Sequence, residues 1–334
     1  YNTLGQMDEY TDVTHEYNKE YTNAQNQIVS KFSELDITTT TKRKIGVFDS
    51  YGARIPGQTG YNTLGQMTDY IDTVNSSATE GLTSTRTMSG ITYKPDGLMN
   101  GYTETLREAS IRIDGTRIEV RAGILALDIT TTTTRAIQSY NALGQMTGYT
   151  DTITSSATTS LMTTRAMSGI TYHSNGLMKG YTDASTDVYR NPDGTIDTNK
   201  LNVTTTTVRA IALNGYNALG QMTGYTDTID SSASTGLTTT RTMSGIAYSD
   251  KAFMLSYRDV TNEVKNASTA LQLDVTTTTD RVISGYNPLG QMTGYTDTVT
   301  SLATQNMETV RIMSIASYNT LGQMDEYTDV THEY

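Results

Sequence analysis

The stretch SYNALGQMTGYTDTITSSATTSLMTTRAMSGITY (residues 139–172) decides the fold, because the chain repeats it several times with few changes. Its heptad Tyr-Asn-x-Leu-Gly-Gln-Met begins at six places, which are Tyr1, Tyr61, Tyr140, Tyr216, Tyr286 and Tyr318. A looser form, Tyr-x-x-x-Gly-Leu-Met, begins at Tyr93 and Tyr172. Self-similarity of this kind is typical of an array in which each unit buries its faces against its neighbours.

One half of the repeat has a fixed length and the other half varies. The motif tyrosines lie 32 residues apart in four places (61 to 93, 140 to 172, 216 to 248 and 286 to 318). The alternate steps are 47, 44 and 38 residues long (93 to 140, 172 to 216 and 248 to 286). Such length differences are expected at the tips of hairpins, because loops accept insertions.

The two ends of the sequence carry the same segment. Residues 1–17, YNTLGQMDEYTDVTHEY, recur without a change at 318–334, whereas the other units differ from one another within a few positions. We therefore predict a single repeat array over residues 1–334, in which 1–317 are one super-repeat and 318–334 begin the next. We expect the chain to be one period of a longer array.

The composition favours strands over a thick apolar core. Hydrophobic residues make up 36% of the chain, which has 23 Tyr, three Phe and no Trp. Tyrosine and threonine suit a half-buried pleated surface. The net charge of −11 and the lack of a basic cluster disfavour nucleic acid or an anionic membrane as partners. No apolar run approaches the roughly 20 residues of a membrane span, so no membrane insertion is predicted. Without cysteine, disulfides and thiolate metal sites are excluded.

The quoted stretch predicts a turn, a strand, a reversal and a returning strand. Residues 141–145 form the turn, where a glycine can adopt a positive φ. This glycine recurs as Gly65, Gly144, Gly176, Gly220 and Gly290. Residues 146–154 are typical of the outgoing strand and 160–172 of the return. We predict an all-β fold, in which tandem antiparallel hairpins form one continuous spiral sheet shaped as a hollow tube or shell. We expect Leu143 and Met146 to pack between stacked hairpins.

An arginine precedes each motif aromatic by five to seven residues. In the variable halves it lies directly after a run of threonines or one residue further on, as Arg43, Arg135, Arg209 and Arg281. In the fixed halves it is Arg86, Arg165, Arg241 or Arg311. Recurrence in this register predicts a ladder of cation–π or carboxylate contacts with Tyr or Asp of the adjacent unit. The alternative is a solvated strand charge.

The string Tyr-Asn-Ala-Leu-Gly-Gln-Met-Thr, with an upstream arginine and a following Gly-Tyr-Thr-Asp, resembles the repeat of the RHS/YD-repeat family, Tyr-Asp-x-x-Gly-Arg-Leu. Asn replaces Asp in every full heptad, and Gln-Met replaces Arg-Leu. The resemblance implies β-hairpins winding into a spiral sheet, which forms a shell around a cargo in toxin complexes and an extracellular barrel in teneurins. The self-cleaving aspartyl segment of the family's toxin shells has no match in this sequence.

The regular array favours a structural function. We expect a non-enzymatic structural protein, located outside the cell or on its surface, that forms an extended β-tube, fibre or stalk with copies of itself. One alternative is a wall segment of a toxin-encapsulating shell. Another is an adhesin that binds glycans or host surfaces through projecting hairpins such as 110–121, where Asp114-Gly115 predicts a tight turn.

Few residues of the chain suggest chemistry. The three histidines, His15, His173 and His332, lack non-repeating partners for a Ser–His–Asp arrangement. Asn191, Asp193 and Asp197 have the alternate spacing of an oxygen-ligand loop, but Gly194 is misplaced for an EF-hand. We therefore predict no catalytic residue, no cofactor and no metal, with these three residues as the candidates for a cation.

Overall fold

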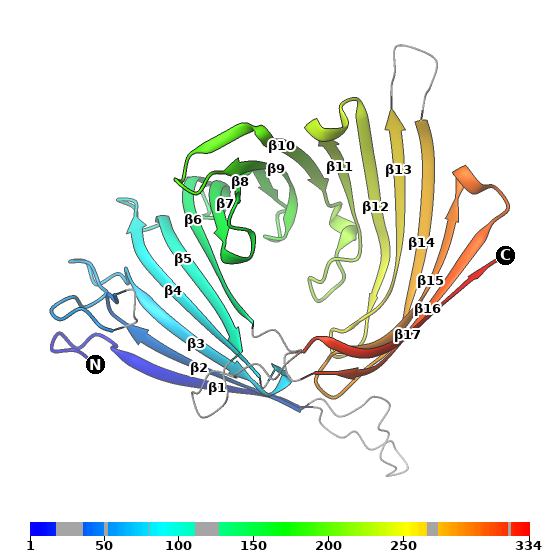
Figure 1. The fold of residues 1–334 in the computed structure, drawn as a ribbon. Coiled ribbons are helices and arrows are strands. Elements are labelled where there is room, and N and C mark those ends of the chain that lie inside the picture. The colour runs from blue at the N-terminus through cyan, green and yellow to red at the C-terminus, as the bar shows by residue number, and fades with distance from the viewer. Residues whose placement is uncertain (18–35, 50–52, 80, 111–126, 266–272, 320–321) are drawn as a thin grey trace, which may run out of the picture.

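The structure is a computed structural model that describes residues 1–17, 36–49, 53–79, 81–110, 127–265, 273–319 and 322–334. The predicted hairpin at 110–121 lies almost entirely outside these residues. The described residues form one antiparallel sheet of 17 strands, in which each strand pairs with the next along the chain (Figure 1). The predicted all-β fold of tandem hairpins is confirmed.

The strands are β1 (Glu9–Tyr17), β2 (Asp36–Ile45), β3 (Tyr70–Ser76), β4 (Leu82–Tyr93), β5 (Met99–Ser110), β6 (Asp128–Tyr140), β7 (Met146–Ser155), β8 (Leu161–Tyr172), β9 (Met178–Arg190), β10 (Ile196–Ala210), β11 (Tyr225–Ser231), β12 (Leu237–Tyr248), β13 (Met254–Lys265), β14 (Leu273–Tyr286), β15 (Met292–Ser301), β16 (Glu308–Tyr318) and β17 (Met324–Glu333). The helical elements are short 3₁₀ turns: η1 (Ser77–Thr79), η2 (Ser156–Thr158), η3 (Leu213–Gly215), η4 (Ser232–Ser234) and η5 (Leu302–Thr304). Among the residues described, no helix has the length and apolar character needed to cross a membrane.

The predicted hairpin of the quoted stretch is present as β7, η2 and β8. The Ser155 hydroxyl caps η2 by accepting a hydrogen bond from the main-chain N–H of Ala157 at 3.3 Å. The Ser156 hydroxyl accepts one from the N–H of Thr130 at 2.9 Å, which ties the reversal to the preceding strand. The two serines that begin this reversal therefore have distinct contacts.

The two ends of the strands form two rims of the sheet. The motif turns, such as 141–145, connect an even-numbered strand to the next odd-numbered one and lie on one rim, which we call the motif rim. The 3₁₀ turns η1, η2, η4 and η5 lie on the opposite rim, which we call the hairpin rim. The variable connections β5–β6, β9–β10 and β13–β14 start at the hairpin rim, and on the motif rim the β2–β3 and β10–β11 connections are longer than the other motif turns.

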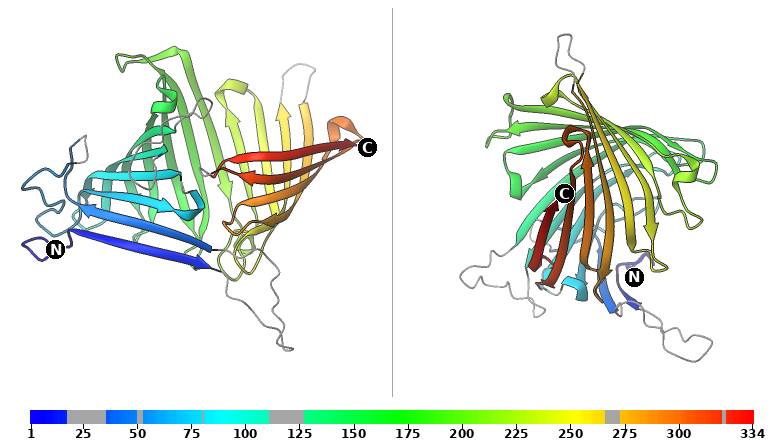
Figure 2. Two further views of the ribbon diagram at one scale, coloured as in Figure 1. Left: turned by 60° about the horizontal axis from the view of Figure 1, so that its bottom comes forward. Right: turned by 90° about the vertical axis from the view of Figure 1, so that its right-hand side faces the viewer.

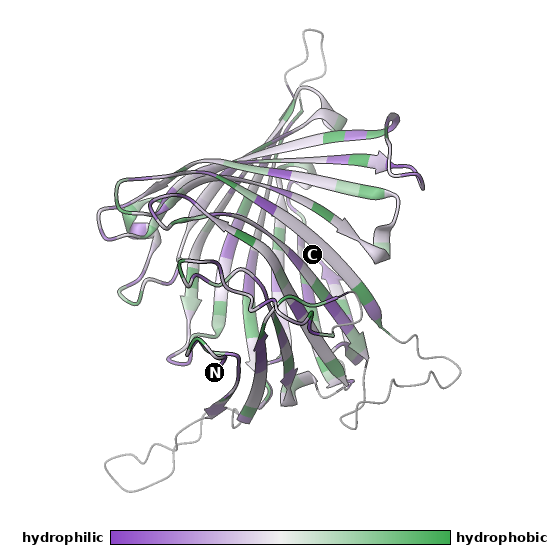
Figure 3. Ribbon diagram, turned by 90° about the vertical axis from the view of Figure 1, so that its left-hand side faces the viewer, coloured by the Kyte–Doolittle hydropathy of each residue, from purple (hydrophilic) through white to green (hydrophobic). Residues whose placement is uncertain are grey.

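The two faces of the sheet differ in chemistry. Tyr102, Arg135, Asp151 and Arg165 lie opposite one another on β5 to β8 and define the ionic face. One residue along each strand, the other face carries an unbroken row of threonines across β5 to β10, and we call it the threonine face. The row consists of Thr103, Thr134, Thr152, Thr164, Thr186 and Thr204. Figure 3 shows that hydrophobic segments are scattered among polar ones instead of forming a broad apolar surface.

A narrow belt of methionine and isoleucine supplies much of the buried apolar surface. Within β8, Met167 is 6% exposed and Ile170 is 4% exposed, close to the motif rim. The same pair recurs in β4, β12 and β16 as Met88 and Ile91, Met243 and Ile246, and Met313 and Ile315. This belt replaces the thick core that the composition excludes.

The sheet curls until its later strands meet its earlier ones (Figures 1 and 2). The Asp36 N–H, at the start of β2, donates a hydrogen bond to the Pro288 carbonyl oxygen in the β14–β15 turn at 3.1 Å. A Cβ atom at Gly322, in the β16–β17 turn, would lie 2.9 Å from Thr79 Cγ2 in η1. The motif rim of one turn of the spiral therefore contacts the hairpin rim of the previous turn, thirteen strands earlier. On the described residues β1 and β17 pair on one side only, so the sheet does not close.

Candidate functional site

From Tyr61 onward, the hydroxyl of each motif tyrosine binds the preceding unit of the array. The Tyr140 hydroxyl donates a hydrogen bond to the Met99 carbonyl oxygen at 2.7 Å, and the Tyr172 hydroxyl donates one to Met146 at 2.6 Å. The acceptor is always the main-chain oxygen of the motif methionine in the preceding unit, for the donors Tyr61, Tyr93, Tyr140, Tyr172, Tyr216, Tyr248, Tyr286 and Tyr318. Burial raises the pKa of Tyr140 and of Tyr172 above the usual tyrosine value, which keeps the donor proton in place. We call this row of bonds the tyrosine ladder.

The asparagine and glutamine of the heptad hold the turn between them. Asn141 Oδ1 accepts hydrogen bonds from the N–H groups of Leu143 and Gln145 at 2.9 and 3.0 Å. Asn141 Nδ2 donates to Gln145 Oε1 at 2.8 Å. Gly144 completes the turn with a φ of +73°, a value that favours glycine. The asparagine–glutamine contact recurs in the other full heptads as Asn2–Gln6, Asn62–Gln66, Asn217–Gln221, Asn287–Gln291 and Asn319–Gln323.

The glycines predicted in the turns lie on the motif rim, where consecutive turns stack. A Cβ atom on Gly144 would lie 3.7 Å from Leu98 of the preceding turn, and one on Gly176 would lie 3.7 Å from Gln145 Nε2. Gly65, Gly220 and Gly290 adopt the same positive φ. The sixth residue of each of these earlier heptads therefore lies beside the glycine of the next.

The predicted packing of the motif leucine is wrong. Leu143 is 83% exposed and Leu219 is 82% exposed, because the hydrogen bonds to Asn141 and Asn217 place these leucines at the tip of the turn. Met146, by contrast, is half-buried at the start of β7. Sequence spacing alone did not distinguish a tip residue from a packed one.

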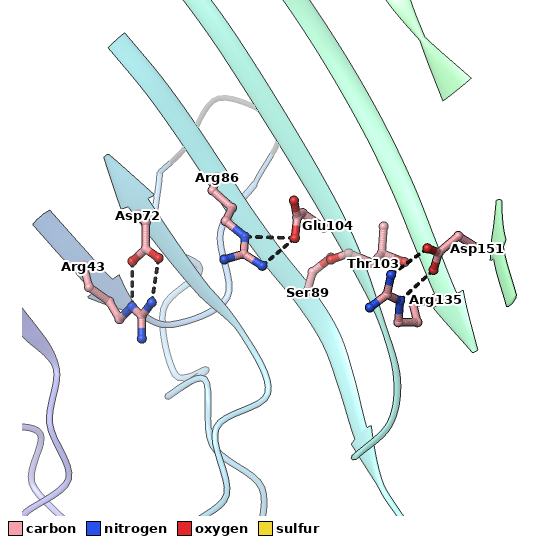
Figure 4. A network of polar contacts seen from close by, with 8 residues as sticks. All are labelled: Arg43, Asp72, Arg86, Ser89, Thr103, Glu104, Arg135 and Asp151. Carbon is pink, nitrogen blue, oxygen red and sulfur yellow. Dashed lines mark hydrogen bonds and ion pairs between the residues drawn. The ribbon is translucent and has the colours of Figure 1, made fainter. Parts of the chain in front are cut away.

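The arginines of the variable halves lie in a regular row on the ionic face. Arg135 binds Asp151 through two hydrogen bonds of 2.7 and 2.6 Å (Figure 4). Its guanidinium carbon lies 3.9 Å from the ring centre of Tyr149. The ring of Tyr102, on the strand before, lies 5.7 Å away on the same face. The hydrogen bonds to Asp151 raise the pKa of Arg135 further, so the guanidinium stays charged.

Three other arginines have the same pair of aromatic rings and a carboxylate. They are Arg43 with Asp72, Arg209 with Asp227 and Arg281 with Asp297. The four aspartates are 3–6% exposed. The ladder of carboxylate and cation–π contacts is therefore confirmed for these arginines, and the solvated alternative is wrong.

The arginines of the fixed halves bind carboxylates that are less deeply buried. Arg165 contacts Asp183 at 2.6 Å and Arg241 contacts Asp259 at 2.7 Å, with aspartate side chains 16–17% exposed. Arg311 contacts Asp329 at 2.6 Å, with Asp329 on the outermost strand at 31% exposure. The ion pairs thus extend across the sheet and become more exposed at β17. The sequence pattern identified the arginines. It gave aspartate only as one possible partner beside tyrosine, and it did not identify the aspartates of Gly-Tyr-Thr-Asp as the residues that bind.

The candidate cation ligands have other contacts. Asp193 Oδ1 accepts hydrogen bonds from the N–H and the hydroxyl of Thr195, within a turn that runs from Asn191 to Thr195. Asp197 lies 3.7 Å from Lys200 Nζ. In the part of the chain that the structure describes, no three or more His, Asp or Glu side chains are grouped to hold a metal ion.

The histidines also lie apart from one another. His15 Nε2 lies 2.6 Å from Asp36 Oδ1 on the exposed surface of the β1–β2 pair. His173 Nε2 lies 3.0 Å from the carbonyl oxygen of Ile211. Two of the recurring arrangements join one unit to the next: the tyrosine ladder and the arginine–aspartate row.

Comparison with known proteins gives no relative: no family model, no curated protein and no solved structure matches the chain.

Proposed function

We propose that this chain is a non-enzymatic structural protein whose array of hairpins forms an extended β-tube, fibre or stalk outside the cell or on its surface. The repeated contacts join neighbouring units in the same way from Tyr61 to Tyr318. The folding free energy of such an array is close to the sum of the contributions of its units and of their interfaces. Further units can therefore be added with the same contacts. The resemblance to the RHS/YD repeat supports the same spiral architecture.

The observation that carries this proposal is the contact between successive turns of the spiral. The bond from Asp36 N–H to Pro288 O joins the two rims without closing the sheet. The close approach of Gly322 to Thr79 repeats the rim contact one hairpin further along. Repeated identical steps generate an open helical body when the rotation does not close. A longer array would therefore stack its turns into a tube.

Electron cryomicroscopy of the native, full-length protein tests the proposal. We expect a continuous tube or fibre whose successive turns are spaced by about one strand length, roughly 40 Å at 3.3 Å per residue with the turns included. Its longer axial period should correspond to the 317-residue super-repeat. Closed particles of fixed size with a cargo inside would overturn the proposal and indicate a wall segment of a toxin shell.

A further inference from the structure

The outer edge of β17 has no paired strand in the described structure. The sequence of β17 indicates which strand would fit there. Residues 326–334 of the β17 segment have the same sequence as residues 9–17, which form β1. β17 pairs with the preceding strand β16, whereas β1 pairs with the following strand β2. The free side of β17 therefore corresponds to the side of β1 that β2 covers.

The aromatic row of the ionic face stops at β17. Tyr102, Tyr181 and Tyr257 each lie 5.6–5.7 Å from an arginine on the following strand. Tyr10 of β1 has the same contact with Arg43 of β2, at 5.7 Å. Tyr327 occupies the equivalent place in β17 and is 55% exposed. An arginine on a following strand would complete the row.

On the threonine face, the β1–β2 pair carries charges that the interior strand pairs lack at the same place. In β1, Glu9 is opposite Lys44 and its carboxylate lies 2.7 Å from Lys42 Nζ. In the equivalent pairs of the interior, both charges are missing: Gly101 is opposite Ala136, Gly180 is opposite Ala210, and Ser256 is opposite Val282. Glutamate and lysine thus occur at this place together. Glu326 of β17 has the position of Glu9, so its matching strand carries the lysines.

The overall charges agree with this pairing. Met324–Glu333 contains no Lys or Arg and has four acidic residues, Asp325, Glu326, Asp329 and Glu333. Asp36–Ile45 contains Lys42, Arg43 and Lys44 against the single acid Asp36. Antiparallel pairing of the two in the β1–β2 register brings Glu326 opposite Lys44 and Tyr327 opposite Arg43.

We infer that the outer side of β17 is a docking site for strand β2 of a second copy of this array, paired in the register of β1 and β2. In the second copy β1 covers β2, but residues 9–17 and 326–334 are identical, so β17 makes the same contacts when it takes the place of β1. The two sheets then continue as one and keep the 317-residue period. The inference rests on the proposed function, since it states how one round of the array joins the next.

Two peptides from the chain itself provide a matched test. Residues 36–45, DITTTTKRKI, and residues 128–137, DITTTTTRAI, differ only where Lys42 and Lys44 are replaced by Thr134 and Ala136. Fluorescently labelled forms are titrated with the 334-residue protein and followed by anisotropy. We expect the 36–45 peptide to bind about tenfold more tightly at low salt and the difference to shrink at high salt, because exposed ion pairs are screened. Equal affinities would overturn the inference.

Variants of the protein locate the binding. Glu326→Lys should abolish the preference for the 36–45 peptide, whereas Glu263→Lys, the same charge change on the interior strand β13, should preserve it. The chain has no cysteine, so an engineered thiol is unique. Val13 is opposite Thr40 in the β1–β2 pair. A 36–45 peptide with Thr40→Cys should therefore form a disulfide with a Val330→Cys protein faster than with a Val13→Cys protein.

The results separate this inference from the proposed function. Equal capture by the two cysteine proteins, or a preference that survives Glu326→Lys, would refute the docking site even if the native protein forms tubes. Selective capture at residue 330 would support the docking site even if imaging shows closed particles, which would refute only the extended architecture.

Discussion

The hydroxyl group of Tyr140 satisfies a main-chain carbonyl at the rim of the sheet, where the strand ladder ends. Its bond to Met99 O joins two units, and the Lys94 ammonium of the preceding turn lies 5.0 Å from the centre of its ring. Tyr140→Phe keeps the ring and removes the bond, so we expect it to lower the free energy of unfolding by about 1 kcal/mol. Urea denaturation of the two proteins measures the difference. Tyr1→Phe is the control, because Tyr1 has the same motif position and is 86% exposed. Equal losses in the two variants would contradict the ladder.

Asn141 and Gln145 form a neutral hydrogen-bonded pair that links the second and sixth residues of the heptad. Asn141→Asp removes the Nδ2 donor and places a carboxylate beside Gln145 Oε1, so we expect a loss of about 1 kcal/mol. Adding Gln145→Arg gives the carboxylate a charged partner and should restore most of that loss. A double-mutant cycle by urea denaturation measures the coupling. Additive effects of the two changes would show that the contact is incidental.

At this scale the sequence predicted the recurring residues better than their contacts. The spacing of the repeats identified Tyr140, Gly144 and the arginines as structurally important, because equivalent positions in an array have equivalent neighbours. It could not identify Met99 O as the acceptor of Tyr140, since main-chain acceptors leave no residue preference of their own. The exposure of Leu143 was not predicted, for a related reason. An apolar residue that recurs in a motif is not necessarily buried, because its burial depends on the geometry of the turn.

Among the elements, neighbouring strands are joined by ion pairs whose burial depends on their place in the sheet. Asp151 on β7 is 3% exposed and binds Arg135 on β6 through both oxygens. Asp151→Ala leaves the Arg135 guanidinium unpaired, so we expect a loss of about 3 kcal/mol in the free energy of unfolding. Asp329→Ala, which removes the partner of Arg311 on the outermost strand, should cost much less because water replaces the carboxylate. Thermal and urea denaturation compare the two variants, and equal costs would contradict the role of burial.

The hairpins themselves were predictable from the sequence, whereas the use of their two faces was not. The stretch that forms β7, η2 and β8 has turn residues at its reversals and strand formers between them. The runs of threonine, however, put a hydroxyl on both faces of the strand, so alternation could not separate the ionic face from the threonine face. Cross-strand register makes that separation: Thr134 is opposite Thr152, and the adjacent Arg135 is opposite Asp151.

For the whole molecule, the 317-residue offset between the identical segments 1–17 and 318–334 and the curl of the sheet are independent quantities. The offset spans sixteen strands, from β1 to β17, but the rims meet after thirteen. The offset is visible in the sequence because residues 1–17 recur. The twist of each strand pair contributes to the curl, and no single residue specifies that twist.

The tyrosine ladder makes the whole array sensitive to alkaline pH. Burial raises the pKa of seven motif tyrosines: Tyr61, Tyr93, Tyr140, Tyr172, Tyr216, Tyr286 and Tyr318. Their contribution to stability is present below the unfolded pKa of about 10 and is lost as the pH rises above it, because the unfolded chain then releases protons that the folded chain retains. We expect unfolding by urea to become easier between about pH 9 and about pH 11. A Tyr140→Phe, Tyr172→Phe double variant should show a weaker dependence, and an identical one would contradict this origin.

The contact between turns of the spiral sets its diameter, and a substitution at Thr79 tests this directly. Thr79 Cγ2 approaches the backbone of Gly322 so closely that a Cβ atom there would lie 2.9 Å from it. Thr79→Trp has no room at this place, so the two rims must separate while the strand pairs remain intact. We expect small-angle X-ray scattering to show a larger radius of gyration with an unchanged circular dichroism spectrum. Thr158→Trp is the matched control, because Thr158 ends η2 as Thr79 ends η1 but is exposed. If both variants keep the original radius, the rim contact does not hold the curl, and strand twist alone determines the shape of the sheet.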